Sequence, residues 1–69
     1  MKNQYVLKMN DNDMFELYEN GTLIKDADWA FELFNFLGKR YNIPTRVCQS
    51  ESHQYAVLRE HIDIEVNFS

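Results

Sequence analysis

The dipeptide Asn20-Gly21 is the feature that most restricts what this chain folds into. Both residues tolerate positive φ angles, which a type I′ turn needs at its two central positions, and this turn joins adjacent antiparallel strands. Residues 14–19 before the dipeptide and residues 22–25 after it contain the aromatic and β-branched residues typical of strands. The dipeptide therefore predicts a β-hairpin built from these two segments.

An earlier strand is expected over residues 4–9. Tyr5, Leu7 and Met9 alternate with residues that would face the other side of a sheet, which is the period of a strand. Residues 10–13, which follow, are all Asn or Asp, and their short side chains bond to the nearby backbone and favour turns. The N-terminal part of the chain thus predicts three consecutive antiparallel strands.

A helix is expected over residues 28–41, with Asp26 or Asp28 as its N-terminal cap. The run contains no proline, and its apolar residues recur at helical spacing along one stripe. The stripe consists of Ala30, Leu33, Phe34, Leu37 and Tyr41. Pro44 prevents the helix from continuing. Gly38 is unfavourable inside a helix, so it marks either an early helix end or a close backbone contact.

Further strands are expected in the C-terminal part of the chain. Residues 45–50 and 54–59 are interpreted as the fourth and fifth strands, joined by a turn at residues 51–53. Residues 61–68 alternate without exception, which places their apolar side chains on the inner face of a sheet. The inward residues are Ile62, Ile64, Val66 and Phe68. Whether residues 58–68 form one long bent strand or two short strands stays open.

These elements together predict an α+β fold: a small antiparallel sheet of four to five strands with one helix packed on one face, in the order βββαββ. A chain of 69 residues has room for only one hydrophobic core, and five Phe, four Tyr and one Trp provide much of its bulk. We therefore expect residues 1–69 to form a single compact domain.

The chain is acidic, with 11 Asp and Glu against 7 Lys and Arg and a formal net charge of −4. This balance disfavours direct binding to nucleic acid or to an anionic membrane surface, because both of these attract cations. The only cysteine, Cys48, has no partner for an internal disulfide, and no apolar run approaches the length of a membrane span. We therefore expect a soluble protein of the reducing cytoplasm.

The sequence contains no strong signal for a metal site or a catalytic group. Residues 10–13 begin like a calcium loop, but Glu16 and Thr22 stand where such a loop needs a glycine and a glutamate. The residues permitted as transition-metal ligands are His53, His61, Cys48, Asp63 and Glu65. They lack the short spacings of known zinc sites, and Cys48 with a histidine matches a catalytic pair by residue type alone. We therefore expect no enzyme, no cofactor and no metal.

The predicted helix carries more aromatic surface than one face of a sheet covers. At 100° per residue, Trp29 and Phe36 lie beyond one edge of the apolar stripe, and Phe31 lies beyond the other edge. A twisted sheet that curls around the helix is one way to bury them. The other interpretation is that Trp29, Phe31 and Phe36 contact a partner, because aromatic side chains often anchor protein interfaces.

Carboxylates gather in the first half of the chain, where no cation lies between Lys8 and Lys25. The carboxylates of this candidate acidic surface are Asp11, Asp13, Glu16, Glu19, Asp26, Asp28 and Glu32. Of these, Asp11, Asp13, Glu16 and Glu19 are the predicted partner-binding residues. Such a surface steers association with a basic groove, including a groove that normally holds nucleic acid. The alternative is ordinary surface charge that keeps the protein soluble.

The leading functional hypothesis is a small non-catalytic protein-binding module that uses acidic and aromatic surface against a larger protein. One form of it is a phage or mobile-element inhibitor that blocks a host defence or nucleic-acid-processing protein. The first alternative is a structural protein that forms a homodimer. The second alternative is a metal or small-molecule binder that uses His53, His61 and Cys48.

Overall fold

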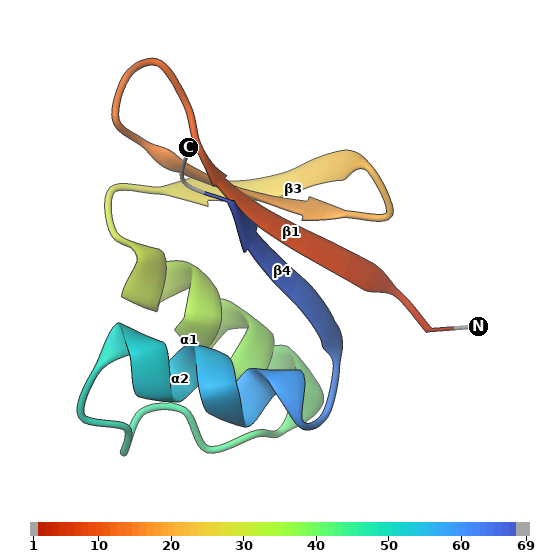
Figure 1. Cartoon of the computed structure of the whole chain (residues 1–69), viewed down its shortest axis with the longest axis vertical. Helices are drawn as coiled ribbons and strands as arrows, with labels where there is room; N and C mark the ends of the chain where they lie inside the picture. Colours follow the sequence, from red (N-terminus) through yellow and green to blue (C-terminus); the bar gives the residue numbers. More distant parts are fainter. Residues whose placement is uncertain (1, 68–69) are drawn as a thin grey trace.

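The computed structural model describes residues 2–67, which form four strands and two helices (Figure 1). The elements are β1 (Gln4–Met9), β2 (Phe15–Glu19), β3 (Thr22–Ala27), α1 (Ala30–Tyr41), α2 (Glu51–Arg59) and β4 (Asp63–Asn67). The predicted α+β class is therefore confirmed. The predicted strands over the first part of the chain and the predicted first helix are also present, with ends that differ by two residues or fewer.

The four strands form one sheet in the order β3-β2-β1-β4. The pairs β1–β2 and β2–β3 are antiparallel, whereas β4 lies beside β1 and runs parallel to it. The sheet is thus mixed, and the expectation of a purely antiparallel sheet was wrong. The reason is the connection: two helices carry the chain back to the end of the sheet where β1 begins, and such a crossover makes the next strand parallel.

Two turns shape the antiparallel part of the sheet. Asn20 and Gly21 have φ angles of 52° and 86°, which confirms the turn that the dipeptide predicts. In the β1–β2 loop, the side-chain oxygen of Asn10 accepts hydrogen bonds from the backbone amides of Asn12 at 2.8 Å and Met14 at 3.0 Å. The loop therefore closes through the local Asn chemistry that its composition indicates.

A second helix, α2, replaces two of the predicted elements. Residues 45–50 form no strand, and the predicted turn and fifth strand over residues 51–59 are helical. The Ser50 hydroxyl caps this helix by accepting a hydrogen bond from the backbone amide of His53 at 3.1 Å. Gln54 and Leu58, four positions apart, are buried on one side of α2. This cap and this spacing outweigh the strand propensity of the segment.

Both helices pack on the same face of the sheet, α1 over β2 and β3 and α2 beside β4 (Figure 1). The core between these layers contains Tyr5, Leu7, Leu17, Ala27, Ala30, Leu33, Phe34, Leu37, Ile43, Leu58 and Ile64. Ile62 and Val66 pack against the core as predicted, whereas Phe68 lies outside the described residues. No helix among residues 2–67 covers the opposite face of the sheet.

Helix α1 begins without the cap that the sequence predicts. Trp29 occupies the N-cap position and makes no side-chain cap bond, so the expectation for Asp26 or Asp28 was wrong. The free backbone amide of Phe31 instead donates to the carboxylate of Glu51 on α2 at 2.9 Å. This bond links the first turns of the two helices. Glu51, which is distant in sequence, therefore caps α1 in place of a neighbouring aspartate.

Gly38 is buried in the last part of α1, where the chain after the helix folds back onto it. A methyl group at this position would lie 2.8 Å from the carbonyl oxygen of Ile43 and would overlap the side chain of Thr45. The helix ends at Asn42, which has the left-handed φ of 61°. Of the two expectations for Gly38, the close contact is therefore the correct one.

Truncating a buried leucine should lower the free energy of unfolding more than truncating an exposed one. Leu37 is fully buried and Leu23 is 46% exposed on the helix-free face. We expect Leu37→Ala to lower the free energy of unfolding by about 2–5 kcal/mol, because it leaves a cavity. The matched variant Leu23→Ala should cost less than about 1 kcal/mol. Urea unfolding measures both values, and equal losses would contradict the placement of Leu37 in the core.

Candidate functional site

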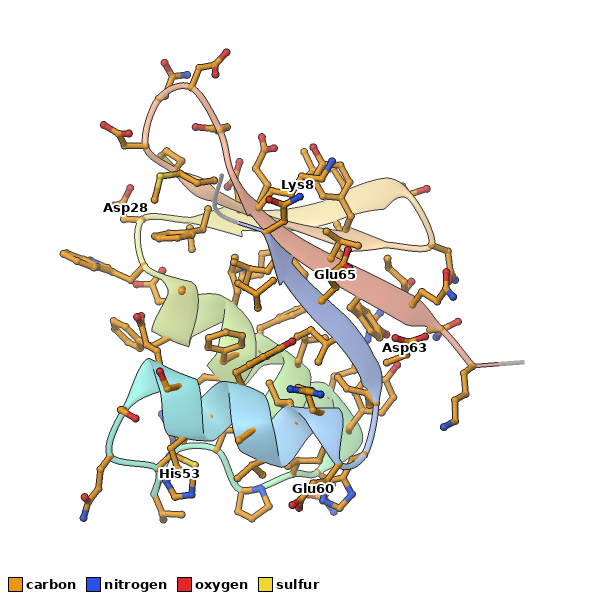
Figure 2. All side chains as sticks on the ribbon, viewed as in Figure 1. Lys8, Asp28, His53, Glu60, Asp63 and Glu65 are labelled. Carbon is orange, nitrogen blue, oxygen red and sulfur yellow. The ribbon has the colours of Figure 1, made fainter. Side chains whose placement is uncertain are left out.

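Two connections leave the sheet at the same end. Met9, Phe15 and Ala27 occupy one row across β1, β2 and β3, so the β1–β2 loop and the β3–α1 connection both start from this row. Figure 1 shows the loop at the top of the molecule and the connection beside it, and Figure 2 places Asp28 on that connection. The arrangement brings Asp28 and Trp29 to the end of the sheet that carries the acidic loop.

Negative charge is concentrated at this end. We define the acidic end by its charged residues and by the apolar residues beside them: Lys8, Met9, Asp11, Asp13, Glu16, Asp26, Asp28, Trp29 and Phe31. Glu16 faces Asp26 on one side and Lys8 on the other in the strand ladder. Five carboxylates against one cation give −4, which equals the net charge of the whole chain. The remaining six carboxylates are balanced by six cations, so the acidic end accounts for the net charge.

Trp29 is the most exposed of the large aromatic side chains in the described region, at 60%. Phe31, in the first turn of α1, is 43% exposed, and Met9 at the end of β1 is 40% exposed. The core cluster is assembled without any of these three side chains. The acidic end therefore combines carboxylates with apolar side chains that the fold leaves accessible.

Phe36 and Glu19, two of the seven residues that the sequence predicts for partner binding, lie away from the acidic end. Phe36 is half-buried, with the Lys25 ammonium 5.3 Å and the Arg40 guanidinium carbon 5.6 Å from its ring centre. Glu19 is ion-paired with Arg40 at 3.0 Å and accepts a hydrogen bond from the hydroxyl of Tyr5 at 2.5 Å. Phe36 and Glu19 thus belong to a cation-rich region, separate from the acidic end.

Glu16 belongs to the acidic end, but part of its hydrogen-bonding capacity is used within the protein. It accepts hydrogen bonds from the hydroxyl of Tyr18 at 2.8 Å and from the side-chain amide of Asn10 at 3.2 Å. The bond to Glu16 raises the pKa of Tyr18, because the carboxylate holds the phenolic proton. Asp11 and Asp13 are exposed in the loop.

A buried polar cluster joins the opposite end of the β1–β2 pair to α1. The Tyr5 hydroxyl, whose residue is 1% exposed, bonds to Glu19 and to the hydroxyl of Tyr41. Burial, followed by the hydrogen bond to Glu19 and the one to Tyr41, raises the pKa of Tyr5. These contacts fix the sheet to the C-terminal end of α1, which is a structural role.

The residues considered as metal ligands are dispersed. Figure 2 shows His53 on α2, well apart from Asp63 and Glu65 on β4. Within residues 2–67, no three His, Cys, Asp or Glu side chains are grouped to hold a metal ion. Cys48 lies half-buried in the irregular segment before α2, rather than on the strand expected for it.

A groove that the sequence does not predict lies beside the second half of α1, along the segment whose residues were expected to form a strand. The groove has a volume of about 510 Å³. Its lining residues are Asn35, Phe36, Gly38, Lys39, Asn42, Ile43, Pro44, Thr45, Arg46 and Val47. The helix-breaking Pro44 six residues after a helical Gly38 is the one available signal that the chain folds back there.

Comparisons with protein-family models, with curated proteins and with solved structures find no match to this chain. Within residues 2–67, neither helix is long and apolar enough to cross a membrane. Any function assigned to the chain therefore rests on its own surfaces.

The buried Tyr5 hydroxyl predicts a loss of stability in alkali. A raised pKa means that the folded state holds the phenolic proton more tightly than the unfolded chain does. The resulting stabilisation is complete below the ordinary tyrosine pKa of 10.0 and is lost as the pH rises above it. In urea titrations, we expect the free energy of unfolding to fall above pH 10, and less steeply in Tyr5→Phe. Identical slopes would contradict this role of Tyr5.

Proposed function

We propose that this chain is a small non-catalytic protein-binding module whose acidic end occupies a basic groove on a larger protein. The supporting observation is that the net charge of the chain lies at the same end as Trp29, the most exposed aromatic ring of the described residues. The module acts in the reducing cytoplasm, where Cys48 stays free. In this proposal it is a phage or mobile-element inhibitor that blocks a host defence or nucleic-acid-processing protein.

The two components of the acidic end have different physical effects on binding. Carboxylates that outnumber nearby cations attract a basic surface over a distance of about one Debye length, which raises the association rate. A basic groove that holds phosphates offers the charge pattern that such an end complements. The indole of Trp29 then supplies apolar contact area, which slows dissociation. Affinity is therefore expected to depend on salt through the carboxylates and on Trp29 at all salt concentrations.

Self-association is the second candidate, and one observation favours it. Val6, Tyr18 and Leu23 lie in one row across the sheet face that no helix among residues 2–67 covers. An apolar row on an open sheet face can serve as a dimer contact. Glu65 extends the same row on β4, so two such faces would bring like charges together. This repulsion makes a heterologous partner the preferred proposal.

The first test compares two charge-neutralised variants as affinity baits. In the acidic-end variant, Asp11→Asn, Asp13→Asn and Asp28→Asn are combined with Trp29→Ala. The control variant carries three equivalent changes away from this end, namely Glu60→Gln, Asp63→Asn and Glu65→Gln. We expect a protein from nuclease-treated lysate of the source cells to bind the wild type and the control stoichiometrically, and the acidic-end variant at least tenfold more weakly.

A competition experiment then tests the nature of the groove. Short duplex DNA should displace the module from the captured protein, and raising the salt concentration should weaken the complex. Equal capture by both variants would contradict the role of the acidic end. A partner that DNA does not displace would contradict the nucleic-acid-processing form of the proposal.

The oligomeric state separates the two candidate functions. We expect sedimentation equilibrium at micromolar concentration to give the mass of one chain, 8.3 kDa. Twice that mass would favour the homodimer, and Leu23→Arg should then restore the monomer, because Leu23 is 46% exposed on the open sheet face. A dimer that survives Leu23→Arg would exclude that face as the contact.

A further inference from the structure

The groove beside α1 lies away from the acidic end. Residues from the second half of α1 form one side, and the chain between α1 and α2 forms the other. Figure 1 shows this connection at the bottom of the molecule, whereas the β1–β2 loop lies at the top. The groove volume of about 510 Å³ falls within the range of roughly 300–1,000 Å³ typical of ligand sites.

The outer wall of the groove is held in place by hydrogen bonds. The backbone amide of Ile43 donates to the carbonyl of Gly38 at 2.7 Å, and the Thr45 hydroxyl donates to the side-chain oxygen of Asn35 at 2.9 Å. The side-chain amide of Gln54 donates to the carbonyl of Thr45 at 3.2 Å. Because the wall is already fixed, a ligand would order little of the protein on binding, which favours affinity.

Apolar side chains at the groove remain accessible. Val47 is 81% exposed, the highest value among the large apolar residues of the described region. Pro44 is exposed and Phe36 is half-buried, and both line the groove with Val47. Aliphatic and aromatic surface of this kind favours a ligand that brings an apolar side chain.

The charge of the groove is positive. Lys39 and Arg46 line it, and its lining includes no Asp or Glu. Within residues 2–67, neither Lys39 nor Arg46 forms an ion pair. Lys25 and Arg40 flank the ring of Phe36, so four of the seven Lys and Arg residues of the chain belong to this region. Of these four cations, Arg40 alone forms an ion pair in the described part of the chain, with Glu19.

We propose that this groove is a second protein-binding site, which takes an acidic peptide segment carrying an apolar side chain. The apolar side chain packs between Phe36 and Val47, and flanking carboxylates pair with Lys39 and Arg46. The planar guanidinium of Arg46 suits a bidentate contact with a carboxylate. This site has the opposite charge to the acidic end. Peptide binding here does not depend on whether the acidic end binds its proposed partner.

The test uses a synthetic peptide, Glu-Asp-Leu-Phe-Asp-Glu with blocked ends, and the full chain labelled with ¹⁵N at low salt. We expect saturable amide shifts confined to residues 35–47, with a dissociation constant below about 1 mM. A peptide with Ser-Ser in place of Leu-Phe should bind at least tenfold more weakly, because it lacks the apolar contact. Shifts located elsewhere, or no binding at 1 mM, would overturn the proposal.

Variants of exposed residues test the charged and the apolar contacts of the groove separately. We expect Arg46→Glu and Val47→Asp each to weaken peptide binding at least tenfold while the spectrum keeps its folded dispersion. Lys2→Glu is the matched charge control and should bind like the wild type, since Lys2 does not line the groove. Equal loss in Lys2→Glu would mean nonspecific charge attraction and would overturn the site. Equally tight binding of 1-naphthoate would assign the groove to small anions and would overturn the peptide as its occupant.

Discussion

The close contact between Gly38 and residues 43–45 is the constraint on which the second half of the fold depends. It turns the chain back along α1 immediately after the helix ends, and Thr45 and Gln54 then join the two helices through Asn35. The bonds satisfy most of the polar groups that this turn buries, although Gln54 Oε1 has no partner among the described residues. With α2 fixed in this way, the chain returns to the start of β1, and β4 pairs with β1 in parallel.

The same layout separates the charges of the molecule. The β1–β2 loop and the β3–α1 connection carry carboxylates to one end, whereas Lys39 in α1 and Arg46 in the connection between the helices lie at another. Glu19 follows the acidic segment in the sequence but does not belong to the acidic end, because it lies against Arg40, 21 residues away. The ion pair neutralises this carboxylate and leaves the negative field concentrated at the acidic end. A small domain thereby presents two surfaces of opposite sign.

Local signals predicted the parts of the fold that depend on neighbouring residues. The alternation of residues 4–9, the Asn20-Gly21 turn and the stripe of α1 each required no knowledge of a distant partner. The strand prediction for residues 45–59 was wrong because strand propensity competes there with two helix signals. The Ser50 cap is local, whereas the Gln54–Leu58 spacing stabilises α2 only through packing against the rest of the fold. The same limit applies to the candidate site: helical angles indicated that Trp29 is peripheral, but nothing local indicated that Lys25 and Arg40 flank Phe36.

One of two notable features at the groove is not required by the packing of the fold. A glycine inside a helix costs roughly 1 kcal/mol relative to alanine, and here it permits the fold-back that forms the groove wall. Val47 contributes little to the core while it stands 81% exposed beside two unpaired cations. The fold itself therefore explains Gly38, whereas the exposure of Val47 is the feature that a binding role of the groove would explain. In a molecule measuring 30 × 30 × 18 Å, the two proposed sites lie at different ends, so a partner at one site would leave the other accessible.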